Sequence, residues 1–73
     1  MSEQAKYLIN SLVEQLALLL MKNYNLSMID ALSFVYNSQW YEKVIDIETE
    51  LYIQSAAYNY QLLQHEMSFG KIL

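Results

Sequence analysis

The sequence predicts an all-α protein, a small bundle of three to four helices. Apolar residues recur every three to four positions through the first third of the chain, which is the period of a helix packed on one face. Three later apolar segments each follow a serine, whose side-chain oxygen can cap the first turn of a helix. We therefore expect residues 1–73 to form a single helical domain.

The longest apolar-periodic segment runs from Glu3 to Asn23, with Ser2 in front of it. Fixing the backbone of a helix costs ~1–2 kcal/mol per residue, so a helix of this length needs partners that cover its apolar side. On a helical wheel, the side chains predicted to face the core fall within an arc of about 140°. They are Ala5, Leu8, Ile9, Leu12, Val13, Leu16, Leu19 and Leu20.

The opposite side of this segment carries a second row of large side chains. Tyr7, Leu18 and Met21 align there with Glu14, at spacings of seven, four and three residues. A short chain without cysteine has no disulfide to stabilise it, and association with a second chain is another source of stability. We therefore expect a homodimer with this row as its self-interface. The alternative is that the chain's own C-terminal residues cover Leu18 and Met21.

Two shorter helices are expected next. Asn residues between 23 and 25 can end the first helix, and Ser27, with Asp30 three residues later, can cap a second that ends near Asn37. Ser38 can cap a short third helix. The side chains expected to face inward are Met28, Ile29, Ala31, Leu32, Val35 and Tyr36 in the second helix, with Phe34 on its flank, and Trp40 and Val44 in the third.

A fourth helix is expected from Ala56 to about Met67, capped by Ser55. Its predicted packing stripe toward the first helix contains Ala56, Tyr60, Leu63 and Met67. Tyr58, Leu62 and His65 form a stripe on the other side. We expect the remaining residues, 68–73, to be a loose tail.

The segment between the third and fourth helices is acidic. Asp46, Glu48 and Glu50 alternate with apolar or neutral residues, which predicts a short extended or irregular connector. In an extended chain the three carboxylates would point to one side, where they would meet a basic partner surface or a divalent cation. The alternative is a solvated loop face. We expect these carboxylates, with Tyr52 and Tyr58, to bind a protein partner.

Seven tyrosines are the most unusual feature of the composition. Tyrosine is enriched at protein interfaces, because it offers a large apolar ring with a polar end. The alternative is that the rings wall a small core while their hydroxyls reach water. Of the seven, we expect Tyr52 and Tyr58 to be the more exposed.

Composition excludes several classes of function. Eight carboxylates stand against four lysines, which are scattered singly, and there is no arginine. Nucleic-acid and membrane-surface binding both need clustered basic residues, so we expect neither. The longest apolar run has six residues, whereas a membrane span needs about 20. The N-terminus shows no basic, apolar leader, and we expect a cytoplasmic location.

We expect no enzyme, cofactor or metal site. The chain has one histidine and no cysteine, and its single glycine excludes a glycine-rich phosphate loop. His65 and Glu66 are neighbours on a helix and point about 100° apart, so they do not form a base with its orienting carboxylate. Ser38 and Ser55 are explained as helix caps.

Two segments of the C-terminal half, YEKVID at 41–46 and ELYIQSAAYNYQLL at 50–63, resemble a family of short, uncharacterised bacterial proteins. The family pattern is a YEKLID-like segment followed by a GLYxQSxxYVYxLL-like one. NLSMIDALSFVYNS at 25–38 is similar to its preceding xxLTxxEALxxxYNS pattern. Here Glu50 replaces the usual glycine and Asn59 the usual valine, and the first change bears on the tight turn before Leu51.

The resemblance implies a setting rather than an activity. The family has no assigned activity, and its genes often lie beside those of ADP-ribosyltransferase-like proteins, which implies a toxin–antitoxin setting. An acidic, tyrosine-rich domain is compatible with masking a basic nucleotide-binding cleft. We therefore expect a protein-interaction module. The alternatives are a small-molecule or lipid carrier, favoured if the helices enclose a cavity, and a nucleic-acid-associated regulator.

Overall fold

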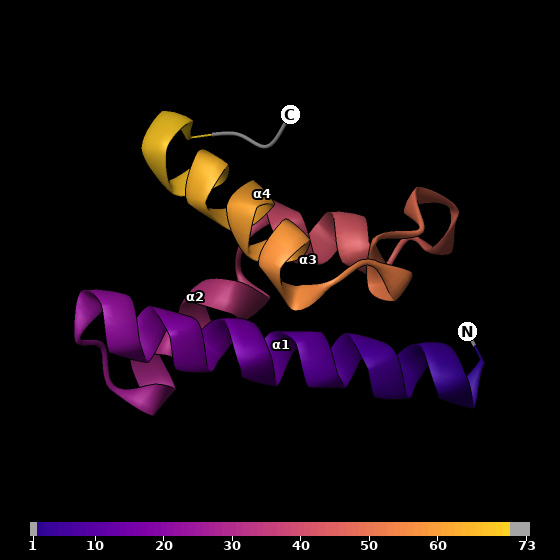
Figure 1. Ribbon diagram of the computed structural model, residues 1–73, viewed down its shortest axis with the longest axis horizontal. Helices are drawn as coiled ribbons and strands as arrows, with labels where there is room; N and C mark the ends of the chain where they lie inside the picture. Colours follow the sequence, from indigo (N-terminus) through magenta and orange to yellow (C-terminus); the bar gives the residue numbers. More distant parts are fainter. Residues whose placement is uncertain (1, 71–73) are drawn as a thin grey trace.

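The computed structural model describes residues 2–70, and these residues form four α-helices and two short 3-10 turns, without a strand. The elements are α1 (Glu3–Tyr24), α2 (Met28–Tyr36), α3 (Gln39–Val44), η1 (Ile47–Thr49), η2 (Leu51–Ile53) and α4 (Ala56–Phe69). The all-α fold is confirmed. α1 runs the length of the molecule, α2 lies beside its C-terminal half, and α3 and α4 pack across it (Figure 1).

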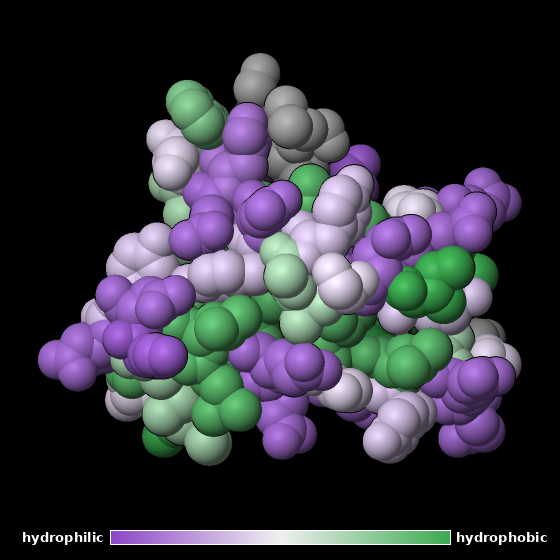
Figure 2. Space-filling model, in the orientation of Figure 1, coloured by the Kyte–Doolittle hydropathy of each residue, from purple (hydrophilic) through white to green (hydrophobic). Residues whose placement is uncertain are grey.

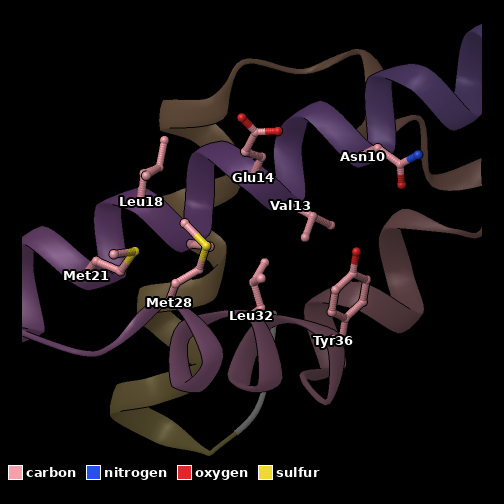
Figure 3. A pocket seen from close by; sticks show the side chains of 9 residues that line it. Asn10, Val13, Glu14, Leu18, Met21, Met28, Leu32 and Tyr36 are labelled. Atoms are coloured by element: carbon pink, nitrogen blue, oxygen red, sulfur yellow. The ribbon is translucent and has the colours of Figure 1, made fainter.

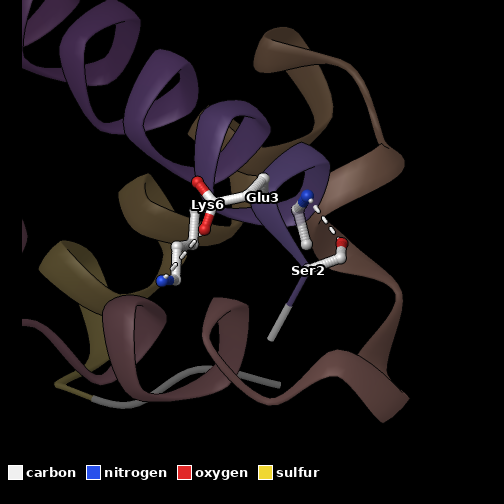
Figure 4. A network of polar contacts seen from close by, with 4 residues as sticks. Ser2, Glu3 and Lys6 are labelled. Carbon is white, nitrogen blue, oxygen red and sulfur yellow. Dashed lines mark hydrogen bonds and ion pairs between the residues drawn. The ribbon is translucent and has the colours of Figure 1, made fainter.

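Each α-helix begins after a serine whose hydroxyl oxygen accepts a hydrogen bond from a backbone N–H three residues later. The bonds are Ser2 to Ala5 at 3.1 Å, Ser27 to Asp30 at 3.1 Å, Ser38 to Tyr41 at 3.1 Å and Ser55 to Tyr58 at 3.0 Å. The caps predicted at Ser27, Ser38 and Ser55 are confirmed. The first turn of α1 also carries an exposed ion pair, in which Lys6 Nζ lies 3.5 Å from Glu3 Oε1 (Figure 4).

The helices end where the backbone turns to the left-handed region or where side chains take up the last carbonyls. Asn25, with φ of 57°, ends α1 as expected. Gly70, with φ of 74°, ends α4 and donates its N–H to the Glu66 carbonyl at 2.7 Å. α4 therefore continues past Met67 and includes Ser68 and Phe69, which were expected in the loose tail. Residues 71–73 of that tail lie outside the described residues.

One hydrophobic core forms where α1 meets all the other helices. Most of the predicted stripe of α1 is buried there, although Leu8 and Leu19 are only half-buried. Ala17 is buried as well, because α2 packs on that side of α1 and the small side chain lets the two helices approach. The largest fully buried apolar side chains are Leu16, Leu20, Val13, Val35, Trp40, Val44 and Leu63.

A buried hydrogen-bond network links α3, η2 and α4. The indole N–H of Trp40 donates to Asn59 Oδ1 at 2.8 Å, and both side chains are fully buried. The amide nitrogen of Asn59 donates in turn to the carbonyls of Leu51 and Ser55, each at 3.0 Å. Sequence analysis predicted Trp40 as a core residue but missed Asn59. The signal was available, since a buried indole N–H needs an acceptor.

A second link holds the N-terminus of α3 against α4. Glu66 Oε2 accepts from the backbone N–H of Gln39 at 2.8 Å, and Oε1 accepts from that of Trp40 at 2.9 Å. Ser38 supplies the next acceptor, to Tyr41. The first three N–H groups of α3 are thus all satisfied, and the carboxylate complements the positive end of the helix dipole.

The acidic connector is irregular rather than extended, which is the second of the two predicted forms. Asp46 caps η1 by accepting from the Glu48 N–H at 3.1 Å, and the Thr49 hydroxyl lies 2.9 Å from the Lys43 carbonyl oxygen. Glu50 separates the two turns with φ of 57°. A 3-10 turn rotates each residue by about 120°, so alternate side chains do not share a side as they would in a strand. Glu50 thus adopts, in a residue with a Cβ, the left-handed backbone that glycine adopts more readily.

We predict that Asn59→Leu lowers the free energy of unfolding by about 2–3 kcal/mol, because it leaves the Trp40 indole N–H buried without an acceptor. The Trp40→Phe protein has no indole N–H, so there Asn59→Leu should lower the free energy of unfolding by at least about 1 kcal/mol less than in the wild type. Urea unfolding of the four proteins measures this difference. Gln61→Leu on the exposed side of α4 is the control, and equal costs of Asn59→Leu in both backgrounds would contradict the network.

We predict that Glu50→Gly raises the free energy of unfolding by about 0.5–1 kcal/mol, because a left-handed backbone strains any residue with a Cβ. Glu48→Gly removes the same charge two residues earlier, at a position without positive φ. It should instead lower stability by about 0.5–1 kcal/mol. Thermal unfolding of both variants compares the two effects, and a loss of stability in Glu50→Gly would refute the assignment.

Candidate protein-interaction surface

The apolar side of α2 is largely exposed. Seven of its nine residues are apolar or aromatic, but only Ala31 and Val35 are buried. Met28 is 53% exposed and Ile29 79%. The prediction that Met28, Ile29 and Tyr36 face the core is therefore wrong. α2 contacts the core mainly through Ala31 and Val35, with Leu32 half-buried beside them, and α3 meets its C-terminal end.

An open groove of about 340 Å³ lies between α1 and α2. Met28, Leu32 and Tyr36 project from α2 toward Met21 and Val13 of α1 (Figure 3). The buried side chains Val13 and Ala17 form the base of the groove, and the exposed ones form its rim. The full lining is Asn10, Val13, Glu14, Ala17, Leu18, Met21, Met28, Leu32 and Tyr36. We call this the α1–α2 groove.

The groove lining is mainly apolar, with the hydroxyl group of Tyr36 at one end. Asn10 and Glu14 are the polar side chains in its lining, and both are exposed. Within residues 2–70, the ion pair between Lys6 and Glu3 is the single one that the structure shows, so Glu14 has no cationic partner there. The groove thus combines an apolar base with one uncompensated negative charge at its rim.

The row predicted as a self-interface lies partly along this groove. Leu18 is 50% exposed and Tyr7 is 72% exposed, whereas Met21 is half-buried against the core. The alternative, in which C-terminal residues cover Leu18 and Met21, is not what the structure shows within the described residues. The element opposite both side chains is α2, and no residue of α4 lines the groove. Self-association through this row stays a prediction.

The residues predicted to bind a partner lie elsewhere. Asp46, Glu48 and Glu50 are exposed around η1, and Tyr58 is exposed on α4, while Tyr52 is half-buried against the core. None of the five lines the α1–α2 groove. Among the described residues, no three carboxylates or histidines gather closely enough to hold a metal ion. The alignment of the three carboxylates was predicted only for an extended chain, and the connector instead forms two 3-10 turns with all three exposed.

The tyrosines divide between the surface and the edge of the core. The most exposed are Tyr7, Tyr24, Tyr36 and Tyr58, so the expectation is confirmed for Tyr58 and wrong for Tyr52. Tyr60 is buried in the predicted stripe of α4, and its hydroxyl accepts from Asn23 Nδ2 at 2.8 Å. Tyr36 meets Tyr41 edge to face, with ring centroids 5.1 Å apart. This contact fixes Tyr36 at one end of the groove.

The side chains considered for chemistry have structural contacts. The Glu66 carboxylate binds the backbone of α3, and the His65 ring lies 4.6 Å from the Phe69 ring, centroid to centroid. In the described part of the chain, no helix is both long and apolar enough to cross a membrane. Hydrophobic surface nevertheless reaches the outside, notably over the C-terminal half of α1 (Figure 2).

Comparisons with known proteins do not extend this description, since no family model, curated protein or solved structure matches the chain.

We predict that Met28→Gln and Ile29→Gln each change the free energy of unfolding by less than about 0.5 kcal/mol, because both side chains are exposed in the single chain. Val35→Ala, one position from the end of the same helix, should lower it by about 1.5–3 kcal/mol, because its side chain is fully buried. Urea unfolding at the lowest workable protein concentration measures both. If Ile29→Gln lowered the free energy of unfolding as much as Val35→Ala, the Ile29 side chain would have to be buried rather than exposed.

Proposed function

We propose that this protein is a protein-interaction module that docks another polypeptide at the α1–α2 groove. The observation that carries the proposal is the exposure of large apolar side chains in the lining of the groove, where Leu18 of α1 is 50% exposed and Met28 of α2 is 53% exposed. Full burial of such a side chain stabilises a complex by about 1.5–3 kcal/mol. Contiguous apolar surface on a chain this small typically marks a site of association.

The kind of side chain also supports a polypeptide as the ligand. Methionine and tyrosine are enriched in interfaces, because one adapts its shape and the other adds a polar end to a large ring. Met21, Met28 and Tyr36 all line the groove. The groove is open along its length, which suits the side of a helix, whereas small-molecule sites bury most of their ligand in a concave pocket.

The acidic connector supplies negative charge that attracts a basic partner, separately from the groove. Asp46, Glu48 and Glu50 are exposed in a chain with formal net charge −4. Negative charge of this kind accelerates the encounter with a basic protein more than it adds affinity. In the toxin–antitoxin setting implied by the resemblance, the module would be the acidic regulatory partner of a neighbouring gene's product.

The test is the mass of the protein in solution over a wide concentration range. We expect the wild-type chain to associate, and Leu18→Glu combined with Met28→Glu to stay monomeric and folded, because each change places a charge in the apolar lining of the groove. Gln4→Glu combined with Gln61→Glu adds the same charge at exposed positions outside the groove and should associate like the wild type. Circular dichroism checks that all three proteins are folded.

The proposal fails if the wild type is monomeric throughout and a column carrying it retains the same proteins as a column carrying the groove variant. The acidic connector is tested in the same way. Reversing the charges of Asp46, Glu48 and Glu50 should slow the capture of a basic partner without changing self-association.

A further inference from the structure

We propose that the α1–α2 surface binds a second copy of this chain, with the two α1 helices antiparallel about a two-fold axis at Leu18. This inference rests on the proposed function and names the partner for the same surface. The observation behind it is a charge pattern that is complementary to itself. Glu14 and Lys22 stand four residues before and four residues after Leu18, and all three side chains are exposed.

The three residues share one side of α1. Positions four apart on an α-helix are separated by about 40° around the axis and by about 6 Å along it, so Glu14, Leu18 and Lys22 form one continuous row. Glu14 and Lys22 are about 12 Å apart along the helix, too far for a direct ion pair within one chain. Neither has an ion-pair partner within residues 2–70. Both charged groups are exposed and are therefore accessible to a second chain.

An antiparallel pair centred on Leu18 provides that partner. A two-fold axis at this position places each residue before Leu18 opposite the residue equally far after it in the other chain. Glu14 of each protomer then meets Lys22 of its partner, and the two Leu18 side chains meet at the axis. Because a two-fold interface uses the same patch on both chains, one row of three residues supplies two ion pairs.

The same charges disfavour a parallel arrangement of the two α1 helices. In a parallel pair in register, Glu14 would face Glu14 and Lys22 would face Lys22, and like charges placed together are unfavourable. Apolar groups such as Leu18 of α1 and Met28 of α2 supply the contact area. Apolar contact does not by itself determine whether the two helices run parallel or antiparallel. The ion pairs therefore set the register and orientation, in the way that flanking charges do in coiled coils.

Charge reversal tests this arrangement directly. Glu14→Lys gives a chain with lysine at both positions, and Lys22→Glu gives one with glutamate at both. We expect each variant alone to self-associate about tenfold more weakly than the wild type or worse, since every intended ion pair becomes a repulsion. The double variant, Glu14→Lys with Lys22→Glu, restores opposite charges at both contacts and should self-associate like the wild type.

Mixing the two single variants is the most discriminating test of the antiparallel arrangement. Lysine at 14 and 22 in one chain then faces glutamate at 22 and 14 in the other, so a heterodimer should form from two proteins that each dimerise poorly. Sedimentation of the separate and mixed proteins measures this. Circular dichroism and the melting temperature establish that each variant is folded, including Lys22→Glu, which loses a basic residue from the last turn of α1.

The outcomes separate this inference from the proposed function. Single reversals that leave association unchanged, while Leu18→Glu with Met28→Glu abolishes it, would overturn the antiparallel arrangement and leave the groove as the docking surface. A double variant that stays as weak as the singles, or a mixture that fails to associate, would also overturn it. A monomeric wild type that binds a different protein at the groove would refute the second copy as the occupant.

Discussion

The hydrogen bond between the Trp40 indole and the Asn59 amide is the interaction on which the arrangement of the C-terminal half depends. Trp40 is the largest fully buried side chain, and its burial requires an acceptor for the indole N–H. Asn59 provides that acceptor and uses its own N–H groups to hold the carbonyls of Leu51 and Ser55. One amide thereby fixes the relative positions of α3, η2 and the start of α4.

Glu66 completes this assembly from the other end of α4. Its carboxylate binds the first two N–H groups of α3, so a helix of only six residues is capped by a side chain 27 positions away from Gln39. Every buried side-chain nitrogen and oxygen in the described residues has a hydrogen-bond partner. Polar groups are thus used here for specificity of packing, while the apolar side chains of α1 supply the burial. α3 and α4 together close one side of α1.

The other side of α1 is closed only in part. α2 is bound through Ala31 and Val35, and its larger side chains lie outside the core beside Leu18 of α1. A nine-residue helix has one edge against α1 and too few neighbours to bury the rest. The proposed function and the proposed antiparallel pair both follow from this imbalance. The charges at Glu14 and Lys22 then give the exposed surface an orientation that apolar contact alone does not define.

The sequence by itself determined the features that depend on nearest neighbours along the chain. Serine caps and Asn25 set most helix ends, and a 3.6-residue period identified the buried face of α1, because these signals act within one or two turns. The tertiary structure decided the rest. The exposure of Ile29, the burial of Asn59 and the capping role of Glu66 each depend on which segments meet in space, and apolar pattern alone assigned Ile29 to the core. The groove depends on how α2 lies against α1, since its lining comes from both helices. The pattern of α2 predicted burial for Met28 and Tyr36, whereas Leu18 and Met21 of α1 were predicted on the side opposite the core.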